Sequence, residues 1–201
     1  AKRFCVPGDL LFAMILNKAG LHQDMTFTFS GMVTEDSVLN FPSTIDGKAN
    51  VYDDNGKEYM SVEAVGDKTS SPTVIESLIR SYVEFSGHTF PDMLIKLMEE
   101  KGVMINPARP MIMYESMSIH LDSVELEEVS LELSQTTLEV DGKRGKASLM
   151  FDLIANGEKV GYGKKFMLLS GLRAYCQDSI DGIVSHYHQK KASYVPQQIA
   201  G

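Results

Sequence analysis

The sequence predicts an α+β fold in which two antiparallel sheets each wrap around a central helix. Two observations lead to this prediction: an internal repeat, and alternating segments bounded by Asn-Gly or Asp-Gly turns. With 201 residues, 43% of them hydrophobic, the chain can bury one sizeable core or two small ones.

The repeat relates two short segments, "PGDLLFAMILNKAG" at 7–20 and "PDMLIKLMEEKG" at 91–102. They align without a gap from Asp9 to Lys18, at an offset of 83 residues. Each begins with Pro near an Asp, which suits a helix N-terminus, and ends with Lys then Gly, which suits a C-terminus. The first segment is apolar around its whole circumference, so we expect an enclosed helix.

Strand and turn patterns follow each of these helices. Asn-Gly and Asp-Gly favour tight hairpins, because both central residues of a type I′ turn need a positive φ. Such turns are expected at 46–48, 55–57, 141–143 and 156–158. Alternating residues predict strands at 26–29, 59–62, 129–133 and 147–151. Each repeat should therefore contain one helix and an antiparallel meander of about four strands.

A sheet curled around a buried helix is the hotdog arrangement, and two such units in tandem make a double hotdog. We assign residues 1–66 to the first repeat, lacking its leading strand and loop, and 67–173 to the second. Residues 174–201 are expected to form a C-terminal helix and a flexible tail. A generic α+β sandwich with a coincidental repeat is the alternative.

An accessory helix precedes the second central helix. Residues 73–85 carry a helical apolar stripe, with Ser71 ahead of it as an N-cap. We expect this helix to stop at Ser86 and Gly87, with a loop leading into the second central helix.

This junction, "FSGHTFPDM", resembles the catalytic loop of MaoC-like (R)-specific enoyl-CoA hydratases, which carry Ser-Gly and then Asp-x-Asn-Pro-x-His. The serine, the glycine and Pro91 match, but His88, Phe90 and Met93 stand where the family has Asp, Asn and His. Water activation beside an enoyl thioester needs a carboxylate and an imidazole. The resemblance therefore implies a degenerate, inactive loop at Gly87, His88, Phe90, Pro91 and Met93.

In the first repeat, the same resemblance implies that backbone N–H groups at the helix N-terminus polarise a thioester carbonyl. It assigns substrate binding to Gly8, Asp9 and Leu10, and we expect the catalytic Asp and His upstream of Ala1. Over nearly its full length the sequence also resembles a proteobacterial family of MaoC-like proteins with no assigned activity.

The function implied is that of a hydratase or dehydratase for acyl-CoA or acyl carrier protein thioesters. The alternative is a non-catalytic module that binds or senses these thioesters, or a scaffold whose sheet edges pair in a homodimer. We expect a homodimer and no cofactor in either case.

Composition argues against several other classes. A net charge of −8 and a pI of about 5.1 argue against a nucleic-acid partner. The longest apolar run, 10–16, is too short to cross a membrane. Cys5 and Cys176 lie far apart, which favours a reduced cytoplasmic setting and argues against a metal site. His120 falls in a strand pattern and is expected to be structural or to lie on a sheet face.

Overall fold

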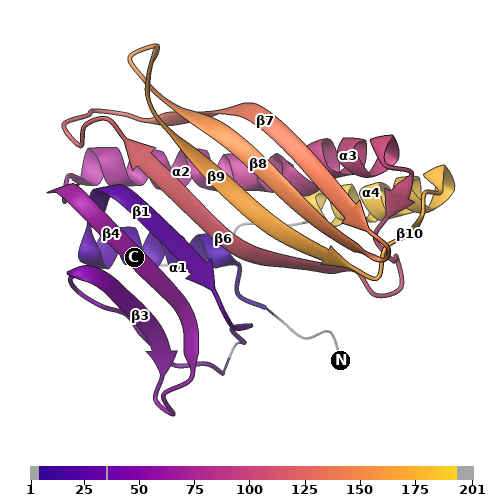
Figure 1. The fold of residues 1–201 in the computed structure, drawn as a ribbon, viewed down its shortest axis with the longest axis horizontal. Helices are drawn as coiled ribbons and strands as arrows, with labels where there is room; N and C mark the ends of the chain where they lie inside the picture. Colours follow the sequence, from indigo (N-terminus) through magenta and orange to yellow (C-terminus); the bar gives the residue numbers. More distant parts are fainter. Residues whose placement is uncertain (1–4, 35, 194–201) are drawn as a thin grey trace.

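In the part of the chain that the structure describes, eight strands form one antiparallel sheet, and the helices lie on one of its faces (Figure 1). The computed structural model describes residues 5–34 and 36–193. The first part contains α1 (Gly8–Ala19), β1 (Leu21–Phe29), β2 (Leu39–Asn40), β3 (Gly47–Asp53) and β4 (Glu58–Thr69). The second contains α2 (Pro72–His88), a π-helical turn η1 (Thr89–Leu94), α3 (Ile95–Glu100), β5 (Val103–Met104), β6 (Met111–Leu121), β7 (Ser130–Asp141), β8 (Arg144–Ala155) and β9 (Glu158–Ser170). The chain continues through β10 (Arg173–Ala174) into α4 (Gln177–Ala192). The expected mixed α+β fold with a large antiparallel sheet and a central helix is confirmed.

The strand order in the sheet is β2-β3-β4-β1-β6-β9-β8-β7. In each half the first long strand pairs with the last one, β1 with β4 and β6 with β9. A simple meander, in which each strand pairs with the next, is therefore the wrong connection for both halves. The two first strands, β1 and β6, pair with each other and join the halves at the centre of the sheet.

Three of the four expected hairpin turns are present. Residues 55–57, 141–143 and 156–158 connect β3 to β4, β7 to β8 and β8 to β9. Their glycines all have a positive φ, but only the turn at 156–158 pairs its glycine with a second residue of positive φ, Asn156, as a type I′ turn requires. The expectation is wrong at 46–48, where Gly47 leads into β3 and closes no hairpin.

The two free edges of the sheet are irregular. One edge strand, β2, is only 2 residues long. The other, β7, is 12 residues long but has a bulge between Leu133 and Gln135. Its Glu132 and Glu139 are exposed.

Helix α1 contributes Leu11, Phe12, Ile15 and Leu16 to the core, all at most 4% exposed. The Phe12 ring meets Phe27 of β1 edge-on and also contacts Tyr82 of α2. However, Leu10 is 52% exposed. The prediction of a helix enclosed on every side is therefore wrong, because the first turn keeps one apolar side chain in solvent.

The loop expected after Phe85 is also wrong. Helix α2 runs on to His88, and η1 then connects it directly to α3. Pro91 lies in η1 and has no N–H to donate to the carbonyl of Gly87, four residues earlier. The hydroxyl of Tyr187 on α4 donates to that carbonyl at 3.1 Å. The π-helical turn and the contact with α4 thus accommodate Pro91 within a continuous helical segment.

Three boundary predictions can be compared with the structure. Ser71 is the N-cap residue of α2, but its side chain makes no capping hydrogen bond. The proposed boundary after residue 66 falls inside β4, which ends at Thr69. The expected C-terminal helix is α4, and the tail at 194–201 lies outside the described residues.

Candidate active site

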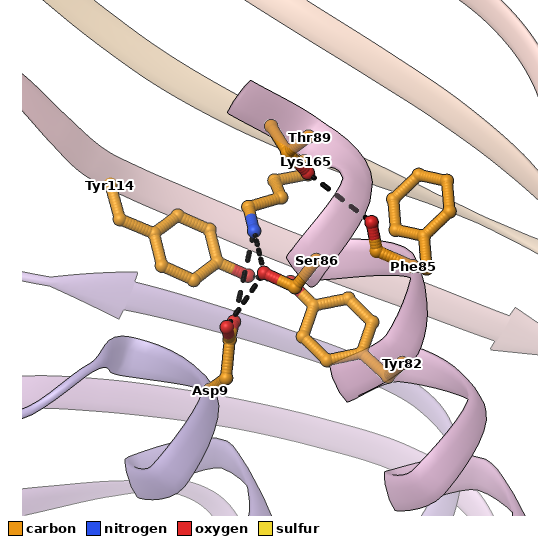
Figure 2. A network of polar contacts seen from close by, with 7 residues as sticks. All are labelled: Asp9, Tyr82, Phe85, Ser86, Thr89, Tyr114 and Lys165. Carbon is orange, nitrogen blue, oxygen red and sulfur yellow. Dashed lines mark hydrogen bonds and ion pairs between the residues drawn. The ribbon is translucent and has the colours of Figure 1, made fainter. Parts of the chain in front are cut away.

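Polar side chains from α1, α2 and β9 meet on the inner side of the sheet (Figure 2). The Ser86 hydroxyl donates to Asp9 Oδ2 at 2.6 Å, and Lys165 Nζ donates to Ser86 Oγ at 2.6 Å. Lys165 Nζ also lies 3.7 Å from Asp9 Oδ1. We call these three residues, with Tyr82 and Tyr114 beside them, the Asp9 cluster. It places a carboxylate, a hydroxyl and an amine within mutual reach.

Lys165 is the buried cation of the cluster. Side chains alternate along β9, so Lys165 points inward while its neighbour Lys164 points outward; Lys165 is 4% exposed. Burial lowers the pKa of Lys165, and the nearby Asp9 opposes that shift. The amine also lies 4.4 Å from the ring centre of Tyr114 and 5.5 Å from that of Tyr82. Lys165 therefore exchanges its hydration for a carboxylate, a hydroxyl and two aromatic faces.

The two tyrosines contribute phenol groups to the cluster, and the phenol of Tyr114 stays protonated. Their hydroxyls are hydrogen-bonded to each other. Burial, and secondarily the charge of Asp9, raises the pKa of Tyr114 well above its usual value. Since two phenols share one hydrogen bond, one O–H proton remains for a further acceptor.

Asp9 has an unused acceptor. Its Oδ1 is buried and has no hydrogen-bond partner among the described residues, with Lys165 Nζ just beyond hydrogen-bond distance. A buried carboxylate oxygen without a donor is costly, so the structure favours a proton donor there.

A pocket of about 380 Å³ adjoins the cluster, between the N-terminal turn of α1, the end of β1 and the start of β6. Its lining includes Gly8, Leu11, Phe29, Met32, Met113 and Tyr114. Tyr114 belongs to both places: its ring stacks on Phe29 at 4.4 Å and lines the pocket, while its hydroxyl lies in the cluster. A Cβ at Gly8 would lie 2.6 Å from Tyr114 Cδ1, so only glycine allows this close approach.

The structure brings together two of the three predicted binding residues. Gly8 lines the pocket and Asp9 lies in the cluster. The side chain of Leu10 points to solvent, and its amide donates to the carbonyl of Pro7 at 3.0 Å. Their role in substrate binding stays a prediction.

The five residues of the expected degenerate loop are helical rather than in a loop. Gly87 and His88 end α2, and Phe90, Pro91 and Met93 lie in η1. His88 Nδ1 lies 2.6 Å from Asp92 Oδ2 on the surface, and the Phe90 ring lies near Tyr187 of α4. None of these five residues joins the Asp9 cluster.

Most residues of the Asp9 cluster were not predicted from the sequence. Lys165, Tyr82 and Tyr114 were not considered as site residues, and Ser86 was noted only as part of a motif. One signal was present: in "GKKFML" two lysines are adjacent, and if the segment forms a strand one of them must face inward.

His120 lies on the opposite face of the sheet. Its Nδ1 is 2.5 Å from Asp24 Oδ1, and its ring lies against Tyr162. This agrees with the expected sheet-face position, and the pair Asp24 and His120 bridges β1 and β6.

Over the described ranges 5–34 and 36–193, no group of three or more His, Cys, Asp and Glu side chains is arranged to hold a metal ion. In those same ranges no helix combines the length and apolarity needed to cross a bilayer.

Comparison with known families places the chain. Residues 1–178 match the family described as protein of unknown function DUF3581. The chain belongs to the DUF3581 family. The description of this family names no hydratase, so the resemblance of the junction to MaoC-like hydratases stays a prediction. No curated protein matches this DUF3581 chain.

Solved structures resemble the chain at low identity. A tesB protein from Mycobacterium avium subs paratuberculosis is 11% identical with a TM-score of 0.46, over 82% of this chain and 87% of that one. A protein assigned as thioesterase II from Thermobifida fusca YX is 9% identical with a TM-score of 0.46, over 85% and 88%. One assigned as an oleoyl thioesterase from Lactobacillus plantarum is 9% identical with a TM-score of 0.43, over 80% of each.

Proposed function

We propose that this chain is a double hotdog protein that hydrolyses acyl thioesters, with Asp9 as its catalytic carboxylate. The observation that carries the proposal is the position of Asp9: in the first turn of α1, inside a polar cluster, and beside an apolar pocket.

The double hotdog assignment is supported by the repeated topology. Each half has a helical segment followed by four sheet strands, and in each the first strand pairs with the last. The central pairing of β1 with β6 relates the halves in the way expected of two tandem units.

The pocket suits the acyl part of a thioester. Its volume lies at the lower end of the range for small-molecule sites, and most of the residues that line it are apolar. The thioester carbonyl would lie at the N-terminus of α1, where N–H groups and the helix dipole favour negative charge. Gly8 keeps this end of the helix accessible to the pocket.

Hydrolysis fits the cluster better than hydration of an enoyl thioester. Hydration of the MaoC type needs an imidazole near the carboxylate. His88 and His120 lie on outer surfaces, paired with Asp92 and Asp24. The cluster instead offers Asp9 as a base for the attacking group, phenol donors for an oxyanion, and the Lys165 ammonium to balance the carboxylate charge.

Binding without turnover is a second candidate, and one observation favours it. Ser86 is hydrogen-bonded to both Asp9 and Lys165, and Lys165 is almost fully buried. These contacts would then serve to hold the two halves of the sheet together. In that case the neighbouring pocket would bind the acyl group of a thioester without hydrolysing it.

The test measures thiol release from a series of acyl-CoA esters by the wild-type chain, Asp9→Asn and the matched control Asp92→Asn. We expect hydrolysis by the wild type, a loss in kcat/KM of about 100- to 10,000-fold in Asp9→Asn, and no loss in Asp92→Asn.

Crotonyl-CoA separates the alternatives. Loss of the enoyl absorbance without thiol release would replace hydrolysis by hydration. Thermal stabilisation by acyl-CoA without any turnover would favour the binding module. Absence of turnover and of stabilisation with every ester would overturn the acyl-thioester proposal.

A further inference from the structure

We propose that Ser86 Oγ is the nucleophile and that the reaction passes through an acyl-serine ester. This inference rests on the proposed thioester hydrolysis and specifies how the Asp9 cluster carries it out.

The geometry around Ser86 is that of an activated hydroxyl. Its proton already points to Asp9 Oδ2 at 2.6 Å, which is the contact required between a nucleophile and its base. On its other side, Lys165 Nζ at 2.6 Å places positive charge against the same oxygen. A positive charge this close favours the alkoxide that forms as the proton moves to Asp9.

Asp9 is poorly placed to attack a carbonyl itself. One carboxylate oxygen, Oδ1, is buried, and the other, Oδ2, accepts the Ser86 hydrogen bond. Ser86 is half-buried, whereas Lys165 is 4% exposed. The serine is therefore the nucleophilic group of the cluster that a substrate can approach.

The tyrosines provide the oxyanion donor that such an attack needs. The raised pKa of Tyr114 keeps its phenol protonated, and the hydrogen bond between Tyr114 and Tyr82 leaves one O–H proton free. Tyr114 lines the pocket with its ring and places its hydroxyl in the cluster, so the inferred position of the substrate carbonyl is between the pocket and Ser86.

The reaction balances with water as the only co-substrate. Ser86 Oγ attacks the thioester carbonyl carbon while its proton passes to Asp9, the C–S bond breaks, and the thiolate takes that proton and leaves as a thiol. Asp9 then removes a proton from water, the water oxygen attacks the acyl-serine ester, and Ser86 recovers a proton as the carboxylic acid leaves.

The experiment uses the full chain and two probes, an acyl-CoA ester and a fluorophosphonate that traps nucleophilic serines. Thiol release, intact mass and peptide mapping are measured for the wild type, Ser86→Ala and Ser86→Cys, with Ser81→Ala as a control. Ser81 lies on the same helix, but its hydroxyl donates to the carbonyl of Val129. Thermal unfolding of each variant checks that it is folded.

We expect the fluorophosphonate to add to Ser86 in the wild type and in Ser81→Ala but not in Ser86→Ala. Thioester hydrolysis should fall at least about 100-fold in Ser86→Ala. Ser86→Cys should hold the acyl group as a thioester that neutral hydroxylamine removes.

Wild-type hydrolysis that persists unchanged in Ser86→Ala would overturn the acyl-serine route and leave the proposed function in place. A loss of rate in Ser86→Ala, with no modification of Ser86 in the wild type or of the thiol in Ser86→Cys, would also overturn it, since Ser86 would then only position Asp9. Modification of Ser86 by the fluorophosphonate without hydrolysis of any thioester would contradict the proposed function but support the nucleophile.

Discussion

Asp9 and Asp92 are aligned by the sequence repeat but have opposite surroundings. Asp92 pairs with His88 four residues earlier, and both side chains are more than half exposed. Asp9 is paired with Ser86 and Lys165, which lie far away in the sequence. Every partner of Asp9 in its cluster comes from the second half, so the cluster is a site between halves. Alignment in the sequence repeat therefore does not decide the surroundings of these acids; the partners supplied by the other half do.

The largest effect on stability is expected for Lys165, the buried cation that pairs with Asp9 and has no equivalent in the pair of Asp92 and His88. Lys165→Met leaves Asp9 without its counter-charge in a buried site and should lower the free energy of unfolding by about 3–5 kcal/mol. Urea unfolding measures this, with Lys164→Met, on the outer face of the same strand, as the control. Equal stability of the two variants would mean that the ion pair is not needed to hold the halves.

Gly8, directly before Asp9, and Gly87, five residues before Asp92, should also respond differently to substitution. In Gly8→Ala the new Cβ meets Tyr114 at 2.6 Å, and we expect a loss of about 1–3 kcal/mol from overpacking. In Gly87→Ala there is no atom within 4 Å, and the helical backbone should gain about 0.5–1 kcal/mol. A stabilised Gly8→Ala in thermal unfolding would contradict the close contact of α1 with Tyr114.

The lowered pKa of Lys165 predicts a specific pH dependence. Between that lowered value and the unfolded value of about 10.4, the unfolded chain binds more protons, so stability should rise with pH. The slope stays below about 1.4 kcal/mol per pH unit. Above about pH 10 the raised pKa of Tyr114 has the opposite effect, since the unfolded phenol loses its proton first.

Unfolding in urea at a series of pH values below about 10, compared between the wild type and Lys165→Met, measures this contribution. If the free energy of unfolding rises equally steeply with pH in both chains, the pH dependence comes from groups other than Lys165.

The smallest effect is expected for the exposed pair in the second repeat. His88→Ala removes a surface contact between residues four apart in the sequence and should change stability by at most about 0.5 kcal/mol. A change above about 2 kcal/mol in urea unfolding would show that this pair has a structural role that its exposure does not suggest.

Local patterns predicted the elements well, and contacts between distant segments explain the failures. Helix α1, most strands and three hairpins followed from periodicity and turn residues. The continuous path through η1 could not be predicted, because the Gly87 carbonyl is satisfied by Tyr187, 100 residues away. Asp9 was selected through the resemblance to MaoC-like hydratases, while Lys165 and Tyr114 were missed because their role depends on how β9 and β6 pass over α1.

The irregular edge strands limit how this sheet can grow. With two residues in β2, and a bulge and outward glutamates on β7, neither border offers a straight, uncharged row of amides and carbonyls to an incoming strand. Copies of the chain that associate would have to pack through their faces, because their edge strands do not favour pairing into a longer β-sheet. The same irregular edge strands disfavour fibrous aggregation of this strand-rich molecule.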